Sequence, residues 1–235
     1  MSKFYIVATP IGNLGDITFR AIETLKNVDL ILCEDTRVTK KLLDKYNIDK
    51  PTMSYHAQSK LAKTDKIFEL LEAGKDLALV SDAGTPGISD PGALLVSQIK
   101  EHFLPPVGGE GRGEVDVIPI PGATALITAL SASGLPTHEF TFLGFFPHKK
   151  GRETLFKEIA ASKRTMVFYE SPHRILKTLE SLVKFCPKEN QKKVCVAREL
   201  TKIYEEFKNG TPAEVLEYFQ NNKEKQRGEF TVIVA

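Results

Sequence analysis

The chain has 235 residues, 42% of them hydrophobic and 26% charged, which is typical of one large or two average-sized globular domains. Residues 1–118 carry 14 basic and 17 acidic side chains, whereas residues 119–235 carry 18 and 13, so the second half is compatible with a polyanionic partner. Three cysteines without Cys-x-x-Cys spacing indicate neither a disulfide framework nor a zinc site. Because the sequence has no signal-peptide pattern and no long apolar span, we expect a cytoplasmic protein with no membrane partner.

Apolar runs alternate with segments of helical periodicity in the first half of the chain. The apolar runs predict strands at residues 4–8, 29–34, 53–56, 77–80 and 115–118. Helices are expected after the N-cap candidate Thr18 and at residues 38–46, 61–73 and 93–102. This alternation predicts an α/β domain with a largely parallel sheet covered by helices on both faces. No loop matches the dinucleotide-binding or phosphate-loop pattern, so a Rossmann site and a nucleoside triphosphatase are poorly supported.

A Gly/Pro-rich segment, residues 81–92, follows the buried strand predicted at residues 77–80. In an open α/β sheet, ligands bind beyond the carboxyl ends of the strands, and glycines there let the backbone approach a bound molecule. An ordinary connection to the next helix is the simpler alternative, although such connections usually take about 2–6 residues. We therefore favour a ligand-binding loop, in which Asp82 and Asp90 either touch the ligand or brace the turn.

Two polar clusters have both a functional and a structural interpretation. Residues 34–37, Glu-Asp-Thr-Arg, stand where the second strand ends, and they indicate either a site or the acidic start of a helix, which the helix dipole favours. Lys149, Lys150 and Arg152 follow two phenylalanines, and they could hold phosphate groups or form a solvated loop.

The best candidate for a domain boundary is the Pro-Ile-Pro-Gly segment at residues 119–122, because two prolines and a glycine interrupt the strand pattern. We expect an N-terminal α/β domain at residues 1–118 and a C-terminal α/β domain at residues 119–235. The helix predicted at residues 123–133 is so poor in large polar side chains that we expect it to be buried nearly all round between the two halves.

The second half again contains strands and helices. Strands are predicted at residues 140–146, 165–170, 193–199, 204–208 and 229–235, and helices at residues 153–161 and 212–220. A further helix is expected to begin with Ser171 as N-cap and Pro172 at its first position. Polar side chains therefore gather after the strand at residues 165–170.

Seven segments taken together resemble the family of small-subunit ribosomal RNA methyltransferases I, within the tetrapyrrole methylase superfamily of class III S-adenosylmethionine methyltransferases. They are VATPIGNLGD (7–16), CEDTR (33–37), SDAGTPGISDPG (81–92), PGAT (121–124), FYESPHR (168–174), ARELTK (197–202) and RGEF (227–230). Porphyrin and diphthine methylases of the same fold share the Gly/Pro loops but lack CEDTR and YESPHR. Residues 104–114 are longer than the connection usual in the family. Many members also extend for several dozen residues beyond the final strand, so if such a tail helps to bind RNA, we expect that binding to be weaker here or to be supplied by other surfaces.

The resemblance implies two α/β domains with S-adenosyl-L-methionine in a cleft between them, a homodimer, and 2′-O-methylation of a cytidine in 16S ribosomal RNA of the small ribosomal subunit. Matched motif by motif, the implied cofactor contacts are Pro10, Ala83, Gly84, Thr85, Ile88, Thr124, Ala125, Tyr169 and Leu200.

The catalytic base stays open at this stage. Methyl transfer to a ribose hydroxyl needs the oxygen, the methyl carbon and the sulfur in line, and a proton acceptor or a cation should help because the hydroxyl is a weak acid. The catalytic candidates are Glu170, His173, Arg198 and Glu199, and the RNA-binding candidates are Arg37, Lys149, Lys150, Arg174 and Lys202. A small-molecule methylase of the tetrapyrrole type and a non-catalytic, cofactor-binding assembly factor are the alternatives.

Overall fold

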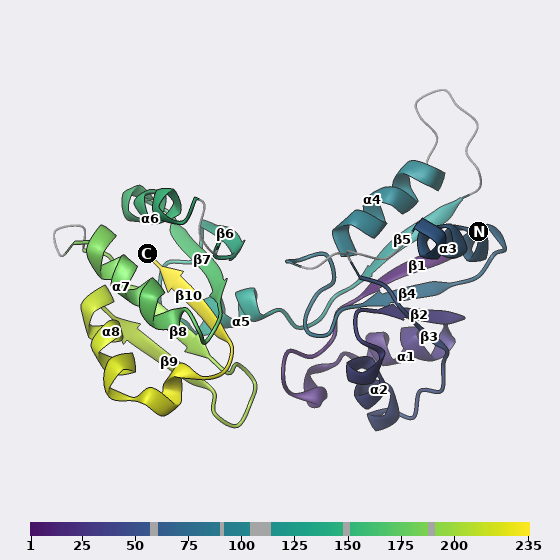
Figure 1. Ribbon diagram of the computed structural model, residues 1–235. Helices are drawn as coiled ribbons and strands as arrows, with labels where there is room; N and C mark the ends of the chain where they lie inside the picture. The colour runs from purple at the N-terminus through teal and green to yellow at the C-terminus, as the bar shows by residue number, and fades with distance from the viewer. Residues whose placement is uncertain (57–60, 90–91, 104–113, 148–150, 188–190) are drawn as a thin grey trace. The chain divides into compact units, whose positions relative to one another are not determined.

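A computed structural model describes residues 1–56, 61–89, 92–103, 114–147, 151–187 and 191–235. The chain divides into two compact units, Met1–Thr124 and Ala125–Ala235 (Figure 1). This division falls slightly later than the predicted boundary after Ile118, because the strand continues through Pro119 to Ile120. That strand lies at an edge of its sheet, where the missing N–H of a proline is tolerated.

The sheet of unit 1 is entirely parallel, as predicted. Its strands lie in the order β3-β2-β4-β1-β5. Their bounds are β1 Ser2–Val7, β2 Leu30–Cys33, β3 Thr52–Ser54, β4 Leu77–Val80 and β5 Val115–Ile120. All four residues of β4 are buried, which explains its unbroken apolar run.

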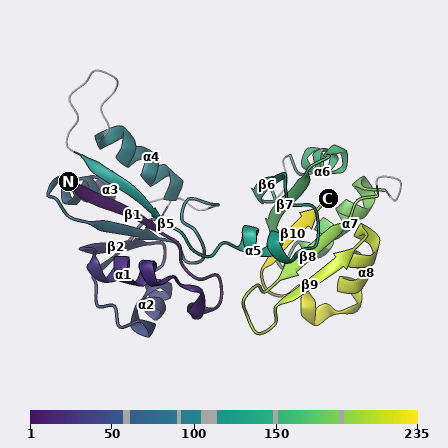
Figure 2. The same cartoon turned by 180° about the vertical axis from the view of Figure 1, so that it is seen from behind.

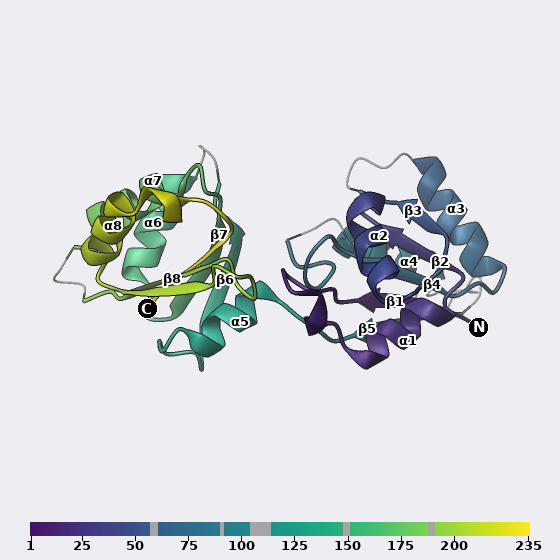
Figure 3. The ribbon, with the colours of Figure 1, turned by 90° about the horizontal axis from the view of Figure 1, so that it is seen from below.

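Helices cover both faces of this sheet (Figures 1 and 3). One core contains side chains of α1 and α2 and the other contains side chains of α3 and α4. The Thr18 hydroxyl accepts from the Ala21 N–H as the predicted cap, and Gly74 ends α3 in the left-handed region at φ +79°. The bounds are α1 Phe19–Asn27, α2 Thr36–Lys45, α3 Leu61–Glu72 and α4 Gly92–Phe103, with a 3-10 turn at Leu14–Asp16.

Unit 2 has a mixed sheet in the order β6-β7-β10-β8-β9, in which β6 and β7 are parallel and the other neighbours are antiparallel. Helices α6, α7 and α8 share one core with this sheet, while α5 packs on β10 on the other face (Figure 2). The strands are β6 Phe140–Phe145, β7 Thr165–Glu170, β8 Val194–Arg198, β9 Glu206–Gly210 and β10 Phe230–Val234. The helices are α5 Ala125–Ala132, α6 Arg152–Ala161, α7 Ile175–Phe185 and α8 Pro212–Asn221, followed by a 3-10 turn at Lys223–Gln226.

Two helices of unit 2 differ from the local sequence pattern. Within the unit, α5 is buried on one side: Leu126 and Leu130 are buried, whereas Ile127 is 48% exposed, and burial of this helix between the two halves stays a prediction. Helix α7 begins at Ile175 rather than at Pro172, and the Ser171 hydroxyl accepts from the guanidinium of Arg174 instead of from a helix N–H. The contact between Ser171 and Arg174, which the local sequence does not reveal, takes the place of the predicted cap of α7.

Candidate functional site

The loops after β1 and β4 meet at the carboxyl edge of the sheet in unit 1. The Thr9 N–H donates to the Gly84 carbonyl at 2.9 Å, and the Gly84 N–H donates to the Thr9 carbonyl at 3.1 Å. Strands β1 and β4 are neighbours whose following helices, α1 and α4, lie on opposite faces of the sheet. Such a reversal of winding is the place where open α/β sheets bind ligands.

Buried hydroxyl groups hold these loops to one another. The Thr9 Oγ1 donates to the Ser81 carbonyl at 3.1 Å, and the Ser81 Oγ donates to the Gly84 carbonyl at 3.1 Å. The Thr85 Oγ1 donates to the carbonyl of Ala123, beyond β5, at 3.2 Å. Three loops that are far apart in the sequence are thereby fixed as one surface.

Two glycines allow this close approach. Gly84 has φ +86°, and a Cβ added there would lie 3.4 Å from the Cγ2 of Ile11. A Cβ at Gly122 would lie 2.9 Å from the Cβ of Ala8, closer than side chains pack. The backbone at this edge therefore has a shape that larger residues would change.

The predicted cofactor residues are distributed over both units, in loops, at the start of α5 and in β7. In unit 1, Pro10 and Gly84 are buried, Thr85 and Thr124 are half-buried, and Ala83 and Ile88 are exposed. In unit 2, the hydroxyl of Tyr169 accepts from the Leu126 N–H at 3.1 Å and so lies beside Ala125, while Leu200 is buried in the loop after β8. Their role in cofactor binding stays a prediction.

The polar cluster after β2 contains a helix start together with an exposed cation. Asp35 is the N-cap of α2, as the structural interpretation requires, and its carboxylate accepts from the Arg37 N–H and guanidinium. The Arg37 side chain is 88% exposed, and its hydrogen bonds lower the pKa of Asp35 to about 2. The Asp35 N–H donates to Asp82, so Asp82 braces the two loops. Asp90 lies outside the described residues.

In unit 2, Glu170 at the end of β7 is the centre of a buried charge network. Its carboxylate accepts from the Ser171 N–H at 2.8 Å and the Thr178 hydroxyl at 2.5 Å. Arg174 Nε lies 2.9 Å and Arg152 Nη1 3.4 Å from its oxygens. The Glu170 side chain is 0% exposed. The arrangement therefore favours a structural role over that of the predicted catalytic acceptor, which must reach the reacting proton.

The Arg152 side chain is neither solvated nor available to phosphate as predicted, because it points into unit 2 and is only 16% exposed. Its guanidinium packs over the rings of Phe146 and Phe156 at 5.0 and 5.2 Å and donates to Thr178 at 2.6 Å. Arg174 is similarly engaged, because it also donates to the Phe146 carbonyl, and only 16% of its side chain is exposed. It offers little of its guanidinium to RNA. Lys149 and Lys150 lie outside the described residues.

The remaining candidates of unit 2 lie near the same end of the sheet. Glu170 and Arg198 both pair with Phe230, from opposite sides, while His173 is exposed in the turn before α7. The Arg198 guanidinium donates to the carbonyls of Arg227 and Tyr204 at 2.7 and 3.3 Å. These contacts brace the β8–β9 loop, so we expect Arg198→Ala to disturb the loop itself, apart from any catalytic role of Arg198.

Glu199 and Lys202 form an ion pair at 3.0 Å, which Glu229 extends. Burial raises the pKa of Glu199, but hydrogen bonds from Lys202 and the Glu229 N–H outweigh it, so the pKa lies below its ordinary value. Burial lowers the pKa of Lys202, but the carboxylates of Glu229 and Glu199, which accept hydrogen bonds from its ammonium, outweigh it and raise the pKa above its ordinary value.

The lowered pKa of Glu199 predicts a pH dependence of stability. A carboxylate with a depressed folded-state pKa contributes stability above its ordinary pKa of about 4.5, and this is lost as the pH falls through the folded-state value. We therefore expect the free energy of unfolding to decline below about pH 4.5. In Glu199→Gln, this decline should be smaller over the same pH range. Urea unfolding of both proteins at several pH values between 3 and 7 measures it, and superimposable slopes would contradict the assignment.

Sequence reasoning missed several residues that shape the site. Thr9 was a polar residue ending an apolar run, and Gly122 was interpreted only as a strand breaker. A single hydroxyl residue between an apolar run and Pro10 was the sequence feature that could have identified Thr9. The inward direction of Arg152 had no local signal, because its partners Glu170 and Thr178 lie on other elements.

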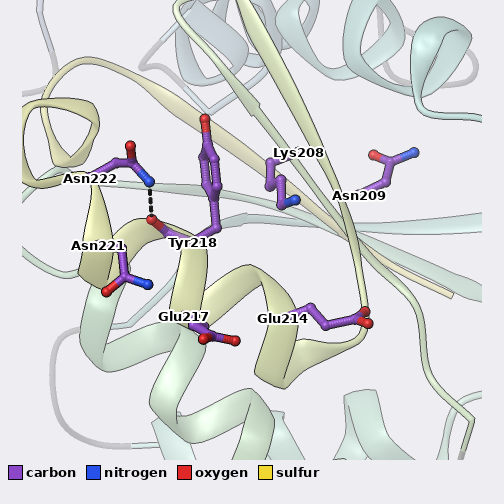
Figure 4. A pocket seen from close by; sticks show the side chains of 7 residues that line it. All are labelled: Lys208, Asn209, Glu214, Glu217, Tyr218, Asn221 and Asn222. Atoms are coloured by element: carbon purple, nitrogen blue, oxygen red, sulfur yellow. Dashed lines mark hydrogen bonds between the residues drawn. The ribbon is translucent and has the colours of Figure 1, made fainter.

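A shallow polar groove of about 450 Å³ lies beside α8 and β9 (Figure 4). Lys208 and Tyr218 line it together with Glu214 and Glu217, and the Lys208 ammonium lies 4.7 Å from the centre of the Tyr218 ring. No predicted site residue lines the groove. Its two carboxylates beside one lysine give no preference for an anionic ligand, so we assign it no role in the site.

Comparison with known proteins identifies the class to which this fold and these loops belong. Residues 3–216 match the family model "Tetrapyrrole (Corrin/Porphyrin) Methylases", and the chain belongs to this family of methyltransferases. Among solved structures, diphthine synthase superposes with a TM-score of 0.70 at 11% identity over 100% of this chain and 90% of that chain. A cobalt precorrin-4 methyltransferase superposes with a TM-score of 0.66 at 17% identity over 99% and 94%. These two show the fold alone.

Curated relatives narrow the resemblance within the family. Proteins named "Ribosomal RNA small subunit methyltransferase I" are 48% identical in Synechocystis sp., 46% in Bacillus subtilis and 43% in Thermotoga maritima. Each alignment covers 100% of this chain, and 79%, 75% and 99% of the respective relative. The resemblance drawn from the seven segments is thereby confirmed. Within the described residues, no helix is both long and apolar enough to cross a membrane.

Proposed function

We propose that this chain transfers a methyl group from S-adenosyl-L-methionine to the ribose 2′-hydroxyl of a cytidine in small-subunit ribosomal RNA, as a cytoplasmic homodimer. The observation that carries the proposal is the identity of 43–48% along the entire chain to relatives named for methylation of that RNA. The CEDTR and YESPHR segments, by which the family resemblance excludes the porphyrin methylases, support the same assignment.

The loops of unit 1 fit the proposed cofactor. Gly84 and Gly122 let the backbone lie close to Ile11 and Ala8, and the Thr9 and Ser81 hydroxyls hold the backbone of residues 81–84 in place. A backbone surface held in this way can contact a folded small molecule without reorganising. In unit 2, Tyr169 and Leu200 are the proposed contacts.

The chemistry that S-adenosylmethionine supplies is a methyl carbon activated by a sulfonium. The chain has to hold the ribose oxygen in line with that carbon and to exclude competing water. Because Glu170 is buried and Glu199 is paired with a lysine, neither carboxylate is available to accept the hydroxyl proton directly. We therefore propose that positioning supplies most of the catalysis, with exposed His173 as the remaining candidate acceptor.

The proposal is tested by methyl transfer from radiolabelled S-adenosylmethionine to small ribosomal subunits that lack the modification. We expect label in the RNA fraction, and none with subunits that already carry the methyl group. Transfer to a precorrin without RNA would instead select the small-molecule alternative. Cofactor binding without transfer to any ribosomal particle would select an assembly factor.

Arg37→Ala is expected to weaken RNA binding with little change in stability. An exposed guanidinium held by Asp35 is oriented to contact a phosphate, and losing one phosphate contact lowers the slope of log affinity against log salt by about one. Fluorescence anisotropy with a labelled ribosomal RNA fragment at several salt concentrations measures this slope. Arg20→Ala, at another exposed arginine of the same unit, is the control, and equal slopes for the two variants would remove Arg37 from the RNA surface.

A further inference from the structure

The turn Arg227–Glu229, which precedes β10, is joined to the start of the loop after β8. Arg198 Nε donates to the Arg227 carbonyl at 2.7 Å. The backbone N–H of Glu229 donates to Glu199 Oε1 at 3.0 Å, and the Glu199 N–H donates to the Glu229 carbonyl at 3.0 Å. The Lys202 ammonium lies 3.0 Å from Glu199 and 2.9 Å from Glu229. The ARELTK and RGEF segments, which are far apart in the sequence, are therefore held together in the folded chain.

The loop has an unusual backbone that this turn supports. Glu199 has φ +52° and Thr201 has φ +64°, a region that non-glycine residues adopt only when their surroundings over-determine it. The Glu199 carboxylate accepts from two groups, the Lys202 ammonium and the Glu229 N–H, and Leu200, the proposed cofactor contact, lies between the two left-handed residues.

Gly228 supplies the space for the Glu199 side chain. It has φ +100°, and a Cβ added there would lie 2.6 Å from both Cδ and Oε1 of Glu199. Any larger residue must displace the carboxylate from its hydrogen bonds, or must move the turn away from the loop. The conformation of Glu199 and that of the turn are therefore mutually dependent.

We propose that Gly228 and Glu199 are positioning residues, which set the loop conformation that presents Leu200 to the cofactor, and that Glu199 is not the catalytic base. This inference rests on the proposed function. The carboxylate is only 17% exposed and already accepts from Lys202 and from the Glu229 N–H, so taking a further proton would release the loop. A lowered pKa of Glu199 agrees with a group that stays ionised.

Gly228→Ala tests the positioning role. We expect the KM and the calorimetric Kd for S-adenosylmethionine to rise by at least about tenfold, with kcat reduced by less than about threefold, because the loss concerns ground-state binding. Gly134→Ala is the matched control in unit 2: it also has a positive φ, +68°, but the nearest atom to its added Cβ is 4.0 Å away. Circular dichroism establishes that both variants fold. Equal cofactor affinities for the two variants would overturn the proposal.

Glu199→Gln and Glu199→Ala separate positioning from proton transfer. Glutamine retains an oxygen that can accept from Lys202 and from the Glu229 N–H. We therefore expect the cofactor affinity of Glu199→Gln to be at least about tenfold higher than that of Glu199→Ala, and the pH profile of its kcat to match that of the wild-type protein. A kcat lowered more than about hundredfold by glutamine at unchanged affinity would make Glu199 the base and overturn the proposal. Calorimetry needs no RNA. The effect of these variants on cofactor binding can therefore be measured even if the wild-type protein does not methylate ribosomal subunits, so the two proposals can fail separately.

Discussion

Gly84→Val is expected to weaken S-adenosylmethionine binding by at least about a hundredfold, which corresponds to about 2.8 kcal/mol. Gly84 adopts φ +86°, where a β-branched residue is strained, and its backbone is paired with Thr9. The added side chain must enter the space next to Ile11 or the space proposed for the cofactor. Isothermal calorimetry of the purified variant measures the loss.

The control for this variant is Gly74→Val, at the end of α3. Gly74 has a similar φ of +79°, but no atom lies within 4 Å of an added Cβ. Both variants should therefore lose about 1–3 kcal/mol of stability from backbone strain, and only Gly84→Val should lose cofactor affinity. Unchanged affinity in Gly84→Val would remove this loop from the binding site.

Glu170→Ala is expected to destabilise unit 2 by about 3–5 kcal/mol, the usual cost of removing one partner from a buried ion pair. The substitution leaves Arg152, Arg174 and Thr178 without their common acceptor in a region where the Glu170 side chain is 0% exposed. Because the chain has two compact units, urea unfolding should be followed by a probe in each unit and need not be two-state.

Glu153→Ala is the matched control for this loss. Glu153 is an acid of the same unit, 65% exposed and paired only with Lys157 in an i,i+4 arrangement, and its removal should change stability by less than about 0.5 kcal/mol. A loss below about 1 kcal/mol in Glu170→Ala would mean that the network contributes little to folding. Glu170 would then return to the list of catalytic candidates.

The sequence predicted elements where local pattern and tertiary environment agree. Strands β4 and β7 were located to the residue, and the parallel sheet of unit 1 followed from strand–helix alternation. Thr18 and Gly74 were recognised because helix caps depend on local backbone geometry. β5 was predicted too short, because the sequence does not reveal that Pro119 lies on an edge strand.

The candidate site was predicted less well, because charged side chains were assigned by their place in the chain. Arg152 and Arg174 looked available to phosphate, whereas the folded chain turns both toward Glu170. The partner of a charged side chain often lies on another element that folding brings close, as Thr178 on α7 does for Arg152. Gly228 shows the same limit, since its close approach to Glu199 joins the turn before β10 to the loop after β8.

The proposed reaction places the methyl group on one particular atom, the 2′-oxygen of a cytidine ribose. Small subunits methylated by this protein with isotopically labelled S-adenosylmethionine should be digested to nucleosides and separated by mass spectrometry. We predict that the label appears on the ribose of a cytidine, as 2′-O-methylcytidine, and that the corresponding linkage resists alkaline cleavage. Label found on a base, or on ribosomal protein with none in RNA, would contradict the proposed function.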